Sequence, residues 1–248
     1  MELAFIPPNK NLNLSLTGDI CLTLANFAKD SEEYVAFYKN VTKYKILDNG
    51  AAEGQQVRKP TLLRLAKAME VQEVVVPDTI YCGWKTTIQF KRFVNRLPED
   101  FFEHYKIMIV PQGQTKNQYL RCLHNMMNYK PEIQKNIVIG LSKYTAPHCF
   151  EDRYNCAFKV STEYPLNPIH LLGATHNIAE IKQYANIKNV RSNDSCVAIL
   201  LAYNNHVISR LELIERPKTV NDYYDTTLNE EQVETAQHNM QIFLASKV

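Results

Sequence analysis

The sequence predicts a (β/α)8 barrel of the TIM type, an α/β fold formed as one domain over residues 1–248. The length of 248 residues is typical of one such barrel. Short apolar runs rich in β-branched residues recur along the chain, and stretches with helical spacing lie between them. Apolar strands joined by helical crossovers indicate a parallel sheet that is covered on both faces.

Six apolar runs are expected to be buried strands: LAFI from Leu3, YKILD from Tyr44, EVVVPD from Glu73, KIMIVPQG from Lys106, NIVIGLS from Asn136 and IHLLGAT from Ile169. Four of them begin at residues 73, 106, 136 and 169, at intervals of 33, 30 and 33 residues. Each interval accommodates one strand, one helix and two loops. We expect a seventh strand at 190–194 and an irregular eighth at 207–214.

Helical spacing of apolar residues predicts helices around 62–69, 90–97, 120–127 and 178–185, with a closing helix after its cap, Asn229. A doubly wound open sheet would show the same alternation. That fold usually has a glycine-rich phosphate turn after its first strand, and IPPNKN stands there instead. The barrel is therefore the favoured fold.

The composition is that of a globular protein, with 45% hydrophobic residues, 22% charged residues and a net charge of +2. A nucleic-acid footprint would have to be local, drawn from the basic residues near predicted loops and helix starts, although any one of them could equally belong to a solvated face. These are Arg58, Lys59, Lys85, Lys91, Arg92, Lys116, Lys143 and Arg153. No signal peptide and no apolar run of about 20 residues is present. We expect a cytoplasmic protein that does not bind membranes.

The six cysteines are scattered without a CxxC pair, which predicts reduced and mostly buried thiols. His148, Cys149 and Cys156 lie close in sequence, but their spacing matches no common zinc pattern. We expect no metal and no cofactor. His170 falls inside a strand and is expected to be an interior residue. Trp84 could stack on a base or pack against a helix.

Polar residues follow the predicted strands at Asp48, Asp78, Gln112 and Asp194. In a barrel, side chains at the C-terminal ends of the strands face one mouth and carry the chemistry. Any one aspartate could be a helix cap or a turn residue. Three carboxylates in one pocket repel one another and shift their pKa values, which favours an enzyme.

The strand-end motifs resemble those of the guanine transglycosylase family, which exchanges guanine for 7-deazaguanine bases in tRNA and, in relatives from DNA-modification systems, in DNA. ILDNGAAE resembles the family's D-S-G-G-F-Q segment, and VVVPD resembles the segment with its base-recognition aspartate. SNDSCVA resembles F-D-C-V, which holds the nucleophile. The resemblance implies that Asp194 is the nucleophile, that Asp48 carries protons and that Asp78 recognises the base.

Three further motifs extend the resemblance. IVPQG is similar to V-Q-G-G, GLS resembles G-G-L-A, and HLLGAT resembles the L-M-G-V-G strand under the base pocket. The resemblance implies that the base is bound by Gln112 and Gly113, by the backbone of Gly140 and Leu141, and by Gly173.

The sequence departs from the family pattern at two positions in the first motif and lacks one subdomain. Glu53 stands where the family has glutamine, and Ala51 replaces a glycine. The C-x-C-x-x-C motif of the tRNA enzymes' zinc subdomain is absent. The sequence therefore looks most similar to compact viral members of the DNA-acting branch, such as those of bacteriophages, which would work in the host cytoplasm.

The expected function is pentosyl transfer that replaces guanine in DNA with 7-cyano-7-deazaguanine or a close analogue. A tRNA-guanine transglycosylase is the first alternative, and a non-catalytic barrel subunit that binds nucleic acid is the second. A retaining glycoside hydrolase would use similar pairs of carboxylates. The sequence leaves open whether a homodimer forms.

Overall fold

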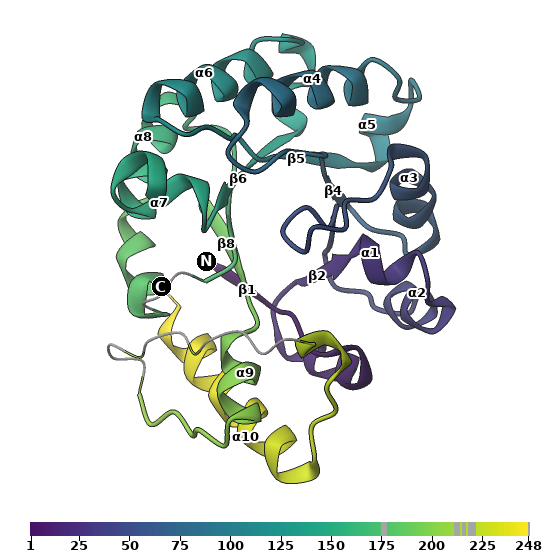
Figure 1. The fold of residues 1–248 in the computed structure, drawn as a ribbon, viewed down its shortest axis with the longest axis vertical. Coiled ribbons are helices and arrows are strands. Elements are labelled where there is room, and N and C mark those ends of the chain that lie inside the picture. The colour runs from purple at the N-terminus through teal and green to yellow at the C-terminus, as the bar shows by residue number, and fades with distance from the viewer. Residues whose placement is uncertain (175–177, 211–213, 215–216, 218–221, 248) are drawn as a thin grey trace.

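The computed structural model describes residues 1–174, 178–210, 214, 217 and 222–247. Eight parallel strands form one sheet in the order β1-β8-β7-β6-β5-β4-β3-β2. Their bounds are β1 Glu2–Phe5, β2 Cys21–Leu24, β3 Lys45–Asp48, β4 Glu73–Val75, β5 Lys106–Ile109, β6 Ile137–Ser142, β7 Ile169–Leu172 and β8 Val190–Ser195. Figure 1 shows the strands around the centre of the molecule with the helices outside them. The predicted (β/α)8 barrel is confirmed.

One predicted strand is wrong. The described residues of 207–214, namely 207–210 and 214, are not in a strand. The strand that the sequence does not predict is β2. Its four residues lead directly into helix α1 (Ala25–Ala28), so no turn residue marks the end of the apolar run.

The barrel is nearly closed, and its seam lies between β1 and β2. These two strands form no ladder with each other. Instead, the backbone of Leu3 meets Asp19, just before β2: its carbonyl accepts from Asp19 N at 2.8 Å, and its N–H donates to Asp19 Oδ2 at 2.9 Å. A side chain thus replaces part of the missing ladder.

Helices connect the strands on the outside of the barrel. Their bounds are α1 Ala25–Ala28, α2 Glu32–Lys39, α3 Lys59–Ala68, α4 Gly83–Val94, α5 Phe101–His104, α6 Lys116–Met127, α7 Thr145–Phe150, α8 Arg153–Glu163, α9 Val197–Tyr203 and α10 Glu230–Ser246. Four segments of the described residues are 3-10 helices: η1 Asn9–Thr17, η2 Pro131–Asn136, η3 Ile178–Asn186 and η4 Tyr223–Asp225. No described helix is long and apolar enough to cross a membrane.

The closing helix α10 begins as predicted. The Asn229 side chain accepts from the Gln232 backbone N–H, and the Gln232 side chain accepts from that of Asn229, which is a capping box. The apolar side of α10 packs against α9, so the two helices share one buried cluster, and they lie side by side in Figure 1.

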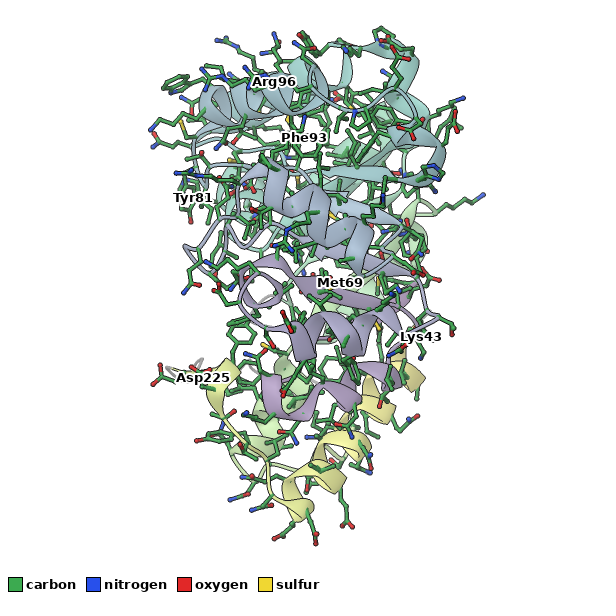
Figure 2. The ribbon with its side chains drawn as sticks, turned by 90° about the vertical axis from the view of Figure 1, so that its right-hand side faces the viewer. Lys43, Met69, Tyr81, Phe93, Arg96 and Asp225 are labelled. Carbon is green, nitrogen blue, oxygen red and sulfur yellow. The ribbon has the colours of Figure 1, made fainter. Side chains whose placement is uncertain are left out.

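The inside of the barrel differs between its two ends. At the N-terminal end, Arg191 on β8 crosses to Glu73 on β4, with Nη1 to Oε2 at 2.8 Å, and Tyr44 donates to the same carboxylate at 2.8 Å. Apolar side chains such as Ile46, Val75 and Met108 fill the middle. Because the bottom and the middle are filled, a ligand can enter only at the C-terminal mouth. Figure 2 shows Tyr81, which follows β4, and Lys43, which precedes β3, on opposite sides of the molecule.

Candidate active site

A cavity of about 290 Å³ lies at the C-terminal ends of the strands. Of the eight residues that the sequence singled out, five line it: Asp48 at the end of β3, Asp78 after β4, Gln112 after β5, Gly173 after β7 and Asp194 in β8. Residues that are up to 146 positions apart in the sequence therefore share one small space.

The other three predicted residues are not among the described residues that line the cavity. Gly140 and Leu141 lie within β6, and a Cβ on Gly140 would meet the side chain of Met108 inside the barrel. Gly113 packs against the start of α6, since a Cβ on it would lie 2.5 Å from Tyr119 N. Their predicted base contacts stay predictions.

Asp194 is 5% exposed and is held through one oxygen. His170 Nε2 lies 3.0 Å from Oδ1, and the Gly173 backbone N–H donates to the same atom at 2.9 Å. Both of these hydrogen bonds end on Oδ1, so Oδ2 is left to interact with a ligand in the cavity. Two contacts on a single oxygen fix the direction in which the carboxylate points.

The partners of Asp194 are themselves fixed. His170 is fully buried, as predicted for an interior residue, and its Nδ1 lies 2.7 Å from Ser192 Oγ. Gly173 has a φ of +70°, and a Cβ there would lie 2.7 Å from Lys143 Cδ, so only glycine suits this turn. A larger residue at 173 would move the N–H that Asp194 accepts.

Arg153, which was one of the candidates for a basic surface, is buried in the structure. It is 1% exposed and donates through Nη1 to the carbonyls of Leu172 at 3.0 Å and Gly173 at 2.6 Å. Its guanidinium therefore braces the end of β7 from inside the protein. The sequence could not show this, because the first residue of a helix looks exposed until the fold around it is known.

Asp78 and Gln112 form a buried polar network. Gln112 Nε2 donates to Asp78 Oδ2 at 2.6 Å, and Asn49 Nδ2 donates to Asp78 Oδ1 at 3.2 Å. Gln112 Oε1 accepts from the Tyr81 backbone N–H at 3.1 Å and from the Thr145 hydroxyl. Burial raises the pKa of Asp78 to about 6, although these two amide donors oppose the shift.

Asp48 shares its surroundings with a fourth acid, Glu53. Burial raises the pKa of Asp48 well above its usual range, and the charges of Glu53, Asp78 and Asp194 raise it further. Burial also raises the pKa of Glu53. Asp48 Oδ1 accepts one opposing hydrogen bond, from Gly50 N at 2.7 Å. The Asp48 carboxyl group is thus suited to carry a proton in the cavity.

The sequence does not place Glu53, Lys143 or Tyr224 in the active site, yet all three line the cavity. Tyr224 donates to Glu53 Oε1 at 3.3 Å, while Glu53 Oε2 is buried without a hydrogen-bond partner among the described residues. Glu53 follows Asp48 by five positions and Lys143 directly follows β6, so proximity to strand ends could have indicated both. Tyr224 comes from η4, which no strand-based pattern would predict.

The cavity is rich in acid, with four carboxyl groups lining it and Lys143 as the one basic side chain among the described lining residues. Among the described residues, no three His, Cys, Asp or Glu side chains converge in a way that could hold a metal ion. All six cysteines are free thiols, and four of them are buried.

No protein-family model matches the chain, and no curated protein matches it. Two solved structures of N-acetylneuraminate lyase from Mycoplasma synoviae, crystal forms II and I, are similar to it, with TM-scores of 0.51 and 0.50. The sequence identities are 11% and 10%, and the alignments cover 98% and 99% of this chain and 97% of each lyase chain. At this identity the similarity concerns the fold alone, which is a barrel along the whole chain.

Proposed function

We propose that the protein is a base-exchange transglycosylase that replaces guanine in DNA with a 7-deazaguanine such as 7-cyano-7-deazaguanine. The observation that carries this proposal is the convergence of Asp48, Asp78, Gln112 and Asp194 in one cavity. These are the residues to which the resemblance assigns proton transfer, base recognition and nucleophilic attack. They lie at the end of the barrel where enzymes of this fold perform their chemistry.

The size of the cavity suits a single base. Its volume of about 290 Å³ is at the lower end of small-molecule sites. A flat purine and the sugar attached to it would occupy such a space. A guanine in duplex DNA would have to leave the base stack to enter.

In the first proposed step, Asp194 Oδ2 attacks C1′ of the target nucleotide. The C1′–O bond forms as the C1′–N9 bond breaks, and the electron pair of that bond leaves with guanine. Asp48 gives its proton to the departing base, so neutral guanine is released and Asp48 becomes a carboxylate. The raised pKa of Asp48 supports this role, because the group holds its proton until the base departs.

In the second proposed step, the incoming 7-deazaguanine attacks C1′ through N9 and displaces the Asp194 carboxylate. Its N9 proton passes to Asp48, which restores the starting state. Two displacements through a covalent glycosyl-enzyme replace a single difficult exchange. Asp194 then needs one oxygen that is fixed and one that is available, as its contacts to His170 and Gly173 provide.

Asp78 and Gln112 are proposed to read the base. An ionised carboxylate has about four acceptor sites, and Asp78 uses two of them on Asn49 and Gln112. The remaining sites can accept from N1–H and the exocyclic amine of guanine. Gln112 donates one amide hydrogen to Asp78 and has a second for the base carbonyl.

Incorporation of radiolabelled guanine into a guanine-containing DNA oligonucleotide and into tRNA tests the proposal. We expect labelling of DNA by the wild type and none by Asp194→Asn. Asp30→Asn, at an exposed aspartate of the loop before α2, is the matched control and should keep full activity. Labelling of tRNA but not DNA would move the protein to the tRNA-acting branch. Absence of labelling from both substrates would refute the proposal.

A further inference from the structure

A second hollow, the α4–α6 groove, adjoins the cavity. It has a volume of about 610 Å³ and is formed by the loops after β4 and β5 together with residues of α4 up to Ile88 and of α6 up to Asn125. Ile80 lines both the cavity and the groove, so the two spaces share a wall. A chain that enters the cavity with one unit can therefore place a neighbouring unit in the groove.

Two aromatic side chains of this groove are exposed. Trp84 is 64% exposed and Tyr81 is 39% exposed, although burial of aromatic surface normally stabilises a protein. Lys85 Nζ lies 5.8 Å from the centre of the Trp84 ring, which adds positive charge beside an aromatic face. Figure 2 shows Tyr81 at the same side of the molecule as Asp225, which belongs to η4.

The position of Tyr81 is maintained at a conformational cost. Its φ is +62°, in the left-handed region that non-glycine residues rarely adopt. The Tyr81 N–H donates to Gln112 Oε1 in the cavity. Gly83 also packs closely against Gln112, because a Cβ on residue 83 would lie 2.4 Å from the Gln112 carbonyl oxygen. The groove wall is thus attached directly to the residue that is proposed to read the base.

The charge of the groove is opposite to that of the cavity. Its described lining residues include Arg121 and no acid, whereas four carboxyl groups line the cavity. The first turn of α4, which begins in the groove, also contains no acidic residue. Gln114, Gln118 and Asn125 add side-chain amides. An anionic chain with flat apolar faces matches these properties, and an acidic partner without such faces would leave the aromatic rings exposed.

We propose that the α4–α6 groove binds the unpaired DNA strand next to the target nucleotide, with a flanking base stacked on Trp84 and a phosphate near Arg121. This inference rests on the proposed function, because a guanine that is flipped into the cavity requires a neighbouring site for the strand that carries it. Base stacking on aromatic side chains tolerates any sequence, so the groove holds the strand while the cavity selects the base.

Trp84 is the only tryptophan of the chain, so its fluorescence reports on this groove alone. The probe is oligo-dT, which contains no guanine and cannot undergo the exchange. We expect oligo-dT to quench Trp84 fluorescence and Trp84→Ala to weaken binding of fluorescein-labelled oligo-dT by about 5- to 100-fold in anisotropy titrations. Arg121→Gln should weaken binding and reduce its dependence on salt. Trp84→Phe, which keeps an aromatic face, is the matched control.

Both Trp84 and Arg121 are exposed, so these variants should fold, and circular dichroism checks this. An absence of quenching, or equal oligo-dT affinity in wild type and Trp84→Ala, would overturn the groove assignment. The result is separable from base exchange. If quenching occurs and exchange does not, the groove stands and the transglycosylase proposal fails. If exchange occurs and Trp84→Ala leaves the KM for DNA unchanged, the groove assignment alone fails.

Discussion

Substitution of Asp78 by Asn should change how the stability of the protein depends on pH. The Asp78 carboxyl has a pKa of about 6 in the folded protein and 3.8 as its ordinary value. Between these two values, the folded state holds a proton that the unfolded state has lost. Stability therefore falls as the pH rises through this window, and the full loss is present above about pH 6. Asparagine does not titrate, so Asp78→Asn escapes this loss.

The expected size of the effect follows from the shift of about two pKa units, which corresponds to about 3 kcal/mol of unfolding free energy. Between pH 4 and pH 7.5, within the measurable range, most of this appears, about 2 kcal/mol. Asparagine offers one acceptor oxygen to two donors, Asn49 and Gln112, so the variant also loses a hydrogen bond. That cost is the same at every pH and adds only a constant offset.

Urea denaturation of wild type and Asp78→Asn at several pH values between 4 and 7.5 measures the difference. The stability of the variant relative to wild type should increase steadily over this range. Asp30→Asn shows how much of any trend comes from removing an aspartate at an exposed site. A difference between wild type and Asp78→Asn that stays constant from pH 4 to 7.5 would refute the conclusion that burial perturbs this carboxyl group.

Three other predictions concern the active site and the ion pair at the N-terminal end of the barrel. The kcat/KM for base exchange should decrease as the pH falls below about 6, because a protonated Asp78 accepts fewer hydrogen bonds from the base. A flat pH profile down to pH 5 would contradict the proposal that Asp78 recognises the base. Glu53→Gln should lower the pKa of Asp48 and so move the alkaline limb of the pH–rate profile to lower pH; an unmoved limb would mean that the two groups do not interact. Arg191→Met should lower the free energy of unfolding by about 3–5 kcal/mol, because the buried Glu73 would lose its cationic partner and keep only the Tyr44 hydroxyl as a donor, and urea denaturation at pH 7 tests this.

Most of the barrel could be predicted because each strand from β3 to β7 contains a distinct apolar run followed by a polar or glycine residue. β8, with the sequence VRSNDS, is mostly polar. β2 was missed for a physical reason: its pairing with β3 and its burial come from the tertiary structure, while its own four residues merge with α1. The expected strand at 207–214 illustrates the opposite error. Val207 and Ile208 are apolar, but Ile208 packs into the cluster of α9 and α10 and not into the sheet.

The site was predictable where its residues lie at or shortly after the C-terminal ends of strands, as Asp48, Asp78, Gln112 and Asp194 do. The fixed direction of Asp194 depends on His170 and Gly173, and no local pattern states which oxygen they contact. Tyr224 reaches Glu53 from 171 positions away, so only the complete fold reveals this contact. Sequence patterns thus place chemical groups at the mouth, whereas pKa shifts arise from packing that the patterns do not contain.

The covalent intermediate on Asp194 is the central claim, and intact-protein mass spectrometry tests it most directly. Wild type mixed with a guanine-containing DNA oligonucleotide and quenched in acid should gain the mass of the oligonucleotide less one guanine. Proteolysis should place the adduct on the peptide that contains Asp194, and Asp194→Asn should show none. Base exchange that proceeds in Asp194→Asn, or an adduct that maps to another residue, would contradict the account.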